Sequence, residues 1–463
     1  MSLTHTAFVT AANLTTNAAW RLRLDEARAL VRLATPIALI ALVNMGMSVT
    51  DTLMVSALFG TEALAAVAVG SDLYSIVFYL SAGVLGGITP FYTAAVARGD
   101  VSERARLMRT AWVIVALLAT LAVPVVWLSP LWLARIGLAP SLLERGQGFT
   151  QAMALTLIPM LGVMLYRTVL TAAEKPKVFL KVTLAMLPLN AVGNYIFMLG
   201  AGPIPALGPT GAGVSTLCVA VASLCVLAII ARRASAAMPG APNSGPWLDM
   251  RSLLAILRVG IPIGIATVTE LGVFLGATLY AATLGAAAVA AHTLTLRTAG
   301  VVYAIPAALL QAAMVRMARA ESLGQSDASR AVVVSSLLLS LVSGILIAAL
   351  LIGGAAPLTS AFFDNSAEGV AAAKLALGLL ILLGLIELVI NPGQAAAGLL
   401  RGRKDTRAPM IYVLFGYWAV SAPLSLFLCE MQGLGITGIW IGLAAGTLVT
   451  TVLSLARLFR LRG

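Results

Sequence analysis

Residues 33–58 have the sequence LATPIALIALVNMGMSVTDTLMVSAL, a run of 26 residues in which Asp51 is the one ionisable side chain. About 20 mainly apolar residues suffice for a helix to cross the hydrocarbon of a bilayer. At 1.5 Å per residue, Asp51 would lie roughly 10 Å from the outer end of such a helix. The stretch therefore predicts a membrane-spanning helix with a carboxylate at membrane depth.

The composition of the whole chain agrees with this interpretation. Hydrophobic residues make up 60% of the 463 positions and charged residues only 10%, whereas soluble domains carry roughly a quarter charged residues. The three cysteines, Cys218, Cys225 and Cys429, show no disulfide or metal spacing. The two histidines, His5 and His292, are too few for a metal cluster. We therefore expect no bound cofactor, no structural metal and no enzymatic activity.

Eleven further apolar stretches complete the predicted architecture, which is an all-α membrane protein of about twelve transmembrane helices. Long apolar runs argue against a membrane barrel, which would show short alternating segments. The twelve predicted spans are 33–58, 64–96, 106–128, 146–173, 179–199, 209–231, 252–282, 286–315, 329–352, 370–399, 408–428 and 436–456.

Basic residues predict the orientation of these helices. They cluster in the N-terminal tail (1–28 and just beyond) and after every second predicted span, as in Arg401-Gly402-Arg403-Lys404. Because cytoplasmic loops are enriched in Lys and Arg, both termini are expected to be cytoplasmic. The net charge of +12 is then a topology signal and does not indicate nucleic-acid binding. We expect a multi-pass protein of the bacterial inner membrane.

The chain also repeats itself. Pro36, in Ala-Thr-Pro-Ile, precedes Pro262, in Gly-Ile-Pro-Ile, by 226 residues, and similar junctions follow in the same order. Six helices per repeat return each half to the same side, so the halves are expected to be parallel and pseudo-symmetric. This predicts an N-lobe (29–233), a cytoplasmic linker (234–250) and a C-lobe (251–463). Two such lobes suit a cavity that opens alternately to each side.

Ionisable groups at membrane depth are functional candidates because they are costly there. In the first lobe, Asn190, Asn194 and Thr216 are predicted at about the depth of Asp51. One carboxylate with amide and hydroxyl oxygens could bind a proton or a hard cation such as Na⁺. Equally, the two asparagines could simply bond neighbouring helices, as amides often do in membranes. Depth alone leaves both interpretations open.

The second lobe offers Glu270 near the middle of its first helix, and Glu387 with Asn391 one turn apart in its fourth. An ion pair between Glu270 and Arg297 is the structural alternative to a functional carboxylate. The Pro392-Gly393 pair is expected to loosen that fourth helix and free backbone carbonyls. Asp72 is either an additional first-lobe acid or a polar residue of the outer rim. Pro36 is a candidate hinge.

Several of these stretches carry a family resemblance. They resemble motifs of the multidrug and toxic compound extrusion (MATE) transporters over nearly the whole chain from residue 28. The matching segments are Val49-Thr50-Asp51-Thr52-Leu53-Met54-Val55, Gly86-Gly87-Ile88-Thr89-Pro90, Asn190-Ala191-Val192-Gly193-Asn194-Tyr195-Ile196-Phe197, Gly211-Ala212-Gly213-Val214-Ser215-Thr216 and Gly398-Leu399-Leu400-Arg401-Gly402-Arg403-Lys404-Asp405. Glu270 matches the acidic residue of the NorM-type bacterial branch.

The resemblance implies an antiporter that exports cationic or amphipathic small molecules in exchange for H⁺ or Na⁺, presumed to act as a monomer. It places the cation-coupling residues of the first lobe at Asp51, Asn190, Asn194 and Thr216, and one of the second lobe at Glu270. The branch usually has an aspartate at the position of Ile390. Either Glu387, one turn earlier, replaces it, or the second-lobe site is incomplete.

Three alternatives remain beside drug export. A flippase for a lipid-linked sugar would be expected to have more helices or a strongly basic cavity. A membrane-embedded enzyme would need a nucleophile–base pair or metal ligands within the membrane. A sensor or assembly partner would carry no substrate flux at all.

Overall fold

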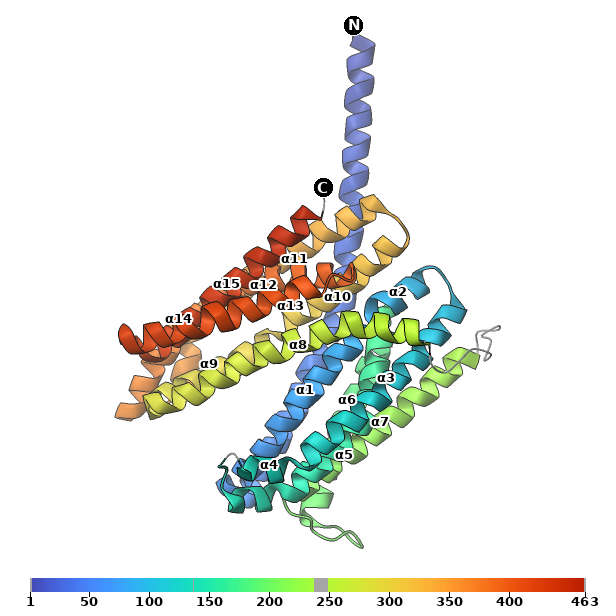
Figure 1. Cartoon of the computed structure of the whole chain (residues 1–463). Helices are drawn as coiled ribbons and strands as arrows, with labels where there is room; N and C mark the ends of the chain where they lie inside the picture. The colour runs from blue at the N-terminus through green and yellow to red at the C-terminus, as the bar shows by residue number, and fades with distance from the viewer. Residues whose placement is uncertain (1, 136, 237–248, 462–463) are drawn as a thin grey trace. The chain divides into compact units, whose positions relative to one another are not determined.

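The computed structural model describes residues 2–135, 137–236 and 249–461, and these residues are almost entirely helical (Figure 1). An isolated bridge between Ala201 and Ile204 is the one β-type pairing among them. Most of the predicted linker, residues 237–248, lies outside the described residues. The all-α prediction is confirmed.

The helices follow one another with short connections. Their bounds are α1 Ser2–Gly86, α2 Thr89–Ala97, α3 Val101–Trp127, α4 Ser129–Arg135, α5 Pro140–Ala172, α6 Pro176–Leu199, α7 Thr210–Ala236, α8 Met250–Ala281, η1 Ala282–Leu284, α9 Ala286–Val302, α10 Ala304–Ser322, α11 Ser326–Phe362, α12 Ala367–Gly402, α13 Arg407–Leu414, η2 Phe415–Ser421, α14 Ala422–Leu426, η3 Phe427–Met431 and α15 Gly435–Arg460.

The number of crossings depends on a break inside α1. The described residues contain 11 helical segments long and apolar enough to span a membrane, and the first runs 78 residues from Trp20 to Ala97. A helix of that length would measure roughly 117 Å, about four times the hydrocarbon thickness. Gly60 interrupts it with φ 80° and ψ −177°, a conformation that glycine adopts readily. The first segment therefore holds two crossings, and the predicted total of twelve is confirmed.

The chain divides into two compact units. Unit 1 comprises residues 1–38 and 269–463, and unit 2 comprises residues 39–268. Helices α1 and α8 each pass from one unit to the other, after Ala38 and after Val268 respectively. Pro36 lies two residues before the first of these points, within continuous helix. The predicted six-helix halves and their boundaries stay a prediction.

Unit 2 brings the second half of α1 against the beginning of α8 through glycines. A Cβ atom added to Gly83 would lie 2.5 Å from the Cα of Gly264, and one added to Gly87 would lie 2.6 Å from the Cα of Gly260. Small residues spaced four apart let two helix backbones touch in this way. The buried Ile256 then packs with Val84 and its neighbours. The crossing therefore depends on the absence of side chains.

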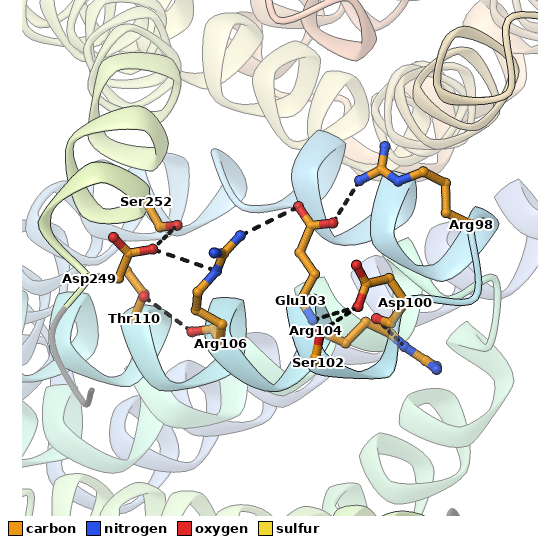
Figure 2. A network of polar contacts seen from close by, with 9 residues as sticks. All are labelled: Arg98, Asp100, Ser102, Glu103, Arg104, Arg106, Thr110, Asp249 and Ser252. Atoms are coloured by element: carbon orange, nitrogen blue, oxygen red, sulfur yellow. Dashed lines mark hydrogen bonds and ion pairs between the residues drawn. The ribbon is translucent and has the colours of Figure 1, made fainter. Parts of the chain in front are cut away.

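A polar network secures the start of α8 in the same unit (Figure 2). The Ser252 hydroxyl donates to Asp249 at 2.6 Å, and Asp249 also lies 3.5 Å from the Arg106 guanidinium. The Glu103 carboxylate lies 4.0 Å from the Arg106 guanidinium and 2.7 Å from the Arg98 guanidinium. The serine hydroxyl, aided by Arg106, lowers the pKa of Asp249. The carboxylate therefore stays ionised at neutral pH, and the network is lost only as the pH falls through that lowered pKa.

Unit 1 holds the first part of α1 by a comparable ion pair. Glu26 accepts two hydrogen bonds from Arg316 at the end of α10, at 2.6 and 2.9 Å, and both side chains are largely buried. The Ser335 hydroxyl of α11 donates to the Arg23 carbonyl at 2.8 Å. Residues 23–26 of the predicted tail are thus packed against helices α10 and α11.

The glycine crossing leads to a testable expectation. Replacing Gly260 with Val should destabilise the protein, because its side chain would enter the space of the Val84 carbonyl, 2.1 Å from an added Cβ. Overpacking of this kind costs about 1–3 kcal/mol. The measurement is the thermal unfolding midpoint of purified protein in detergent. Gly276→Val, on the same helix, is the matched control because nothing lies within 4 Å of its Cβ. Equal midpoints for both variants would contradict the close crossing.

Candidate functional site

The first-lobe candidates meet around Asp51. The Asn194 amide nitrogen donates to an Asp51 carboxylate oxygen at 2.5 Å, joining α6 to α1. Asn190 lies one helical turn before Asn194, and the two are 2% and 0% exposed. Asp51 itself is half-buried. A carboxylate within a membrane-spanning helix is thus held by a neutral donor.

Both asparagines keep an unsatisfied acceptor. Within the described residues, the side-chain oxygens of Asn190 and Asn194 are buried without a hydrogen-bond partner. Buried polar atoms are rarely left unpaired, and each such atom needs an explanation. Two acceptors beside the Asp51 carboxylate are therefore buried without a donor.

Thr216, the fourth first-lobe candidate, forms its hydrogen bond within its own helix. Its hydroxyl donates to the Ala212 carbonyl of its own helix at 3.0 Å. The preceding residue, Ser215, bonds across to α6 instead, donating to the Asn190 carbonyl at 3.1 Å. Gly193 permits this contact, since a Cβ there would lie 2.5 Å from the Ser215 oxygen. Sequence reasoning missed Ser215, although its pairing with a glycine between the two asparagines was a usable signal.

In unit 1, Glu270 faces a tyrosine. The Tyr417 hydroxyl lies 3.4 Å from a Glu270 carboxylate oxygen, and Arg401 is close enough to interact electrostatically. No ion pair between Glu270 and Arg297 occurs in the part of the chain that the structure describes, so the structural alternative raised from the sequence is not what this fold contains. Sequence reasoning missed Tyr417, which lies 147 residues away along the chain.

Glu387 and Asn391 form a second polar group on α12. The Asn391 amide nitrogen donates to the Glu387 carboxylate at 2.7 Å and to the Glu387 carbonyl at 2.9 Å. The Ser343 hydroxyl of α11 donates to the Asn391 oxygen at 2.9 Å. Glu387 is 2% exposed and Asn391 is fully buried. Each polar atom of Asn391 is therefore used, in contrast to the asparagines of α6.

The Pro392-Gly393 pair does not interrupt α12, which runs unbroken from Ala367 to Gly402. The Thr451 hydroxyl donates to the Val389 carbonyl at 3.1 Å. A Cβ on Gly393 would lie 2.2 Å from that hydroxyl, so the glycine makes room for the threonine. The expected loosening of the helix is replaced by a contact with α15.

The two second-lobe carboxylates do not form a pair. Tyr303 interacts electrostatically with both Glu270 and Glu387, and its hydroxyl accepts from Gln394 at 3.1 Å. Ile390, at the position of the expected aspartate, is a buried hydrophobic residue. The lobe therefore presents two separate acids linked through a tyrosine. Asp72, the remaining candidate, is exposed on α1.

His292 is fully engaged by neutral partners. Its Nδ1 accepts from the Trp440 indole N–H at 3.2 Å, which requires the proton of the neutral ring to be on Nε2. Nε2 lies 3.0 Å from the Thr278 hydroxyl, and that hydroxyl donates to the Phe274 carbonyl at 3.0 Å. The histidine is 1% exposed. These bonds tie α8, α9 and α15 together and leave the ring neutral.

Residues 2–135, 137–236 and 249–461 contain no group of three or more His, Cys, Asp or Glu side chains that could hold a metal ion. The oxygen ligands near Asp51 belong to amides. The Asn194 nitrogen faces the carboxylate, so a sodium ion would require that amide to rotate, whereas a proton would not.

A stability prediction follows from the histidine. His292→Phe should leave the Trp440 N–H buried and unpaired, which costs about 1–3 kcal/mol. The double variant His292→Phe/Trp440→Phe removes both partners and should recover part of that loss relative to the sum of the single variants. Thermal unfolding midpoints in detergent measure both effects. Strict additivity of the two single changes would show that the bond contributes nothing.

Comparisons with known proteins give consistent matches. The model of the MatE family matches residues 36–196 and 262–427. A probable multidrug resistance protein NorM of Bradyrhizobium diazoefficiens is 31% identical over 92% of this chain and 91% of its own. A multidrug resistance protein NorM of Burkholderia vietnamiensis is 31% identical over 91% of each.

Solved structures have the same fold at lower identity. A crystal structure of MATE in the bent conformation is 16% identical with a TM-score of 0.84, covering 96% of this chain and 97% of the other. A Pyrococcus furiosus transporter of the MOP superfamily, described by a binding pocket of reversed polarity and a suggested different function, is 18% identical with a TM-score of 0.83, covering 95% and 97%.

Proposed function

The chain belongs to the MatE family of multidrug efflux transporters, and on that basis we propose that it exports cationic, amphipathic small molecules in exchange for protons. It is a multi-pass membrane transporter and not an enzyme. We further propose that it works in a bacterial inner membrane as a monomer with both termini cytoplasmic.

One observation carries the proposal: the Asp51 carboxylate lies within a membrane-spanning helix and accepts a hydrogen bond from a neutral amide. A carboxylate inside a membrane is costly while it is ionised and has no cationic partner. Asn194 stabilises it with a neutral amide, so a bound proton or cation is needed to cancel its charge. Binding an ion from outside then favours a different conformation of the helices around Asp51.

Protons fit this group with fewer changes than sodium ions. The Asn194 nitrogen already donates to one Asp51 carboxylate oxygen, and a proton can bind the carboxylate without rotation of that amide. A sodium ion would need several oxygen ligands directed at one point, whereas Asn194 presents its nitrogen to the carboxylate. The proposed coupling ion is therefore H⁺, with Na⁺ as the alternative that experiment decides.

Exchange follows if a proton and a cationic substrate favour opposite conformations. The ionised Asp51 attracts a cation from the cytoplasm, and the protonated form releases it outside. Pro36 in α1 is the proposed hinge, because it removes one backbone hydrogen bond from a helix that carries Asp51. A ligand changes an equilibrium only by its difference in affinity for the two states.

Efflux measurements test this mechanism directly. Ethidium efflux from proteoliposomes should follow an imposed pH gradient in the wild type. It should fall about tenfold or more in Asp51→Asn, because an amide cannot take up the proton. A tenfold loss corresponds to about 1.4 kcal/mol. Glu62→Gln is the matched control, since Glu62 is an exposed carboxylate of the same helix that pairs with Arg145. It should transport as the wild type does.

Other outcomes would redirect the assignment. Efflux driven by a sodium gradient alone would exclude the proton. Full efflux in Asp51→Asn with unchanged ion dependence would remove Asp51 from the mechanism. Absence of ethidium flux under either gradient would favour transport of a lipid-linked or other amphipath, as in the flippase alternative.

A further inference from the structure

Tyr417 lies on an unusual segment of the helix that carries it. Residues Phe415–Ser421 form a π-helical stretch, η2, between α13 and α14. Wide turns of this kind are rare and occur often at functional sites. The stretch packs on α15 through glycines, since a Cβ on Gly446 would lie 2.5 Å from the Gly416 carbonyl oxygen. The Tyr417 side chain is 3% exposed.

The ring of Tyr417 is fixed between α8 and α15. Its centroid lies 6.4 Å from that of Phe274, at an interplanar angle of 56°. Its hydroxyl lies 3.4 Å from Glu270 on α8 and also 3.4 Å from the Thr447 hydroxyl on α15. The hydroxyl is therefore equidistant from two acceptors on two different helices.

Proton counting shows that these two contacts are mutually exclusive as donations. Thr447 directs its own proton to the Leu443 carbonyl at 2.9 Å, so towards Tyr417 it acts as an acceptor. An ionised carboxylate is also an acceptor. Tyr417 has one hydroxyl proton, so it donates either to Glu270 or to Thr447.

We propose that Tyr417 is a positioning residue that exchanges hydrogen-bond partners when Glu270 gains or loses its proton. While Glu270 is ionised, Tyr417 donates to it. When Glu270 takes a proton from water, the new carboxyl O–H donates to the Tyr417 oxygen, and the Tyr417 proton turns to Thr447. The proton stays on Glu270 and none passes through the tyrosine.

This exchange connects the charge of an α8 side chain to the contact between η2 and α15. It rests on the proposed function, because it treats Glu270 as a carboxylate whose charge changes during transport. The other titratable or charged groups that act on Glu270 are Arg401 of α12 and Tyr303, and Tyr303 in turn interacts with Glu387.

Two substitutions should have opposite effects on the protonation of Glu270. Tyr417→Phe removes the donor to the ionised form, so Glu270 should take up its proton at a pH higher by ~0.5–1 unit. Thr447→Val removes the alternative acceptor, which disfavours the protonated form, so the midpoint should move to lower pH by a similar amount. If Tyr417 and Thr447 had a purely structural role, the two substitutions would not shift the protonation midpoint of Glu270 in opposite directions.

The measurement is a pH titration of reconstituted protein by infrared spectroscopy, following the protonated carboxyl band that disappears in Glu270→Gln. Tyr412→Phe is the control, because that hydroxyl lies near Arg457 instead and should leave the midpoint unchanged. Thermal midpoints confirm that each variant is folded.

Opposite shifts support the exchange of partners. Shifts of the same sign, unchanged midpoints in both variants, or the absence of any titrating band assigned to Glu270 would overturn it. Because the titration needs no substrate, these outcomes are independent of ethidium efflux. If the wild-type protein showed no efflux at all, the proposed function would be wrong instead.

Discussion

The absence of water from the hydrocarbon core of the bilayer is the constraint on which this structure depends. Every backbone N–H and C=O group there requires a partner within the protein, which favours continuous helices. Many hydroxyl side chains obey the same rule, as Thr156 and Thr295 donate to carbonyls one turn earlier. Among the described residues, the departures include the hydroxyls of Ser129, Ser336 and Ser421 and the side-chain oxygens of Asn190 and Asn194, of which the last two lie beside Asp51.

Acidic side chains fall into two groups according to this constraint. Those outside the predicted spans pair with arginine, as Glu26 does with Arg316 and Asp405 with Arg457. Those within the spans accept hydrogen bonds from neutral donors, an amide for Asp51 and Glu387 and a phenol for Glu270, on which Arg401 also acts. A guanidinium partner holds a carboxylate ionised, whereas a neutral donor lets it gain or lose a proton without leaving a buried charge unpaired. The first group joins segments outside the predicted spans, and the second can respond to an ion.

Particular residues show how far sequence patterns reach. Hydropathy predicted separate spans at 33–58 and 64–96, and the break in α1 at Gly60 lies between them, where glycine accommodates φ 80°. The i, i+4 spacing on α6 correctly placed Asn190 and Asn194 near one another, both buried. The Pro392-Gly393 pair misled, since α12 continues through it and Gly393 makes room for the Thr451 hydroxyl of α15. Arg297 was the nearest expected partner of Glu270, and a tyrosine on a π-helical turn takes that place instead.

The sequence by itself determined that the chain crosses the membrane about twelve times as helices and that a few acidic residues lie within those spans. These properties follow from hydrophobicity, which accumulates residue by residue along a segment. Only the tertiary structure decided the partner of each acid, because a hydrogen bond across helices requires matching rotation and depth to within a few tenths of an ångström. Ser343, Tyr417 and Trp440 carry no local signature of the contacts that they make, since each contact joins residues that are distant in sequence and adjacent in space.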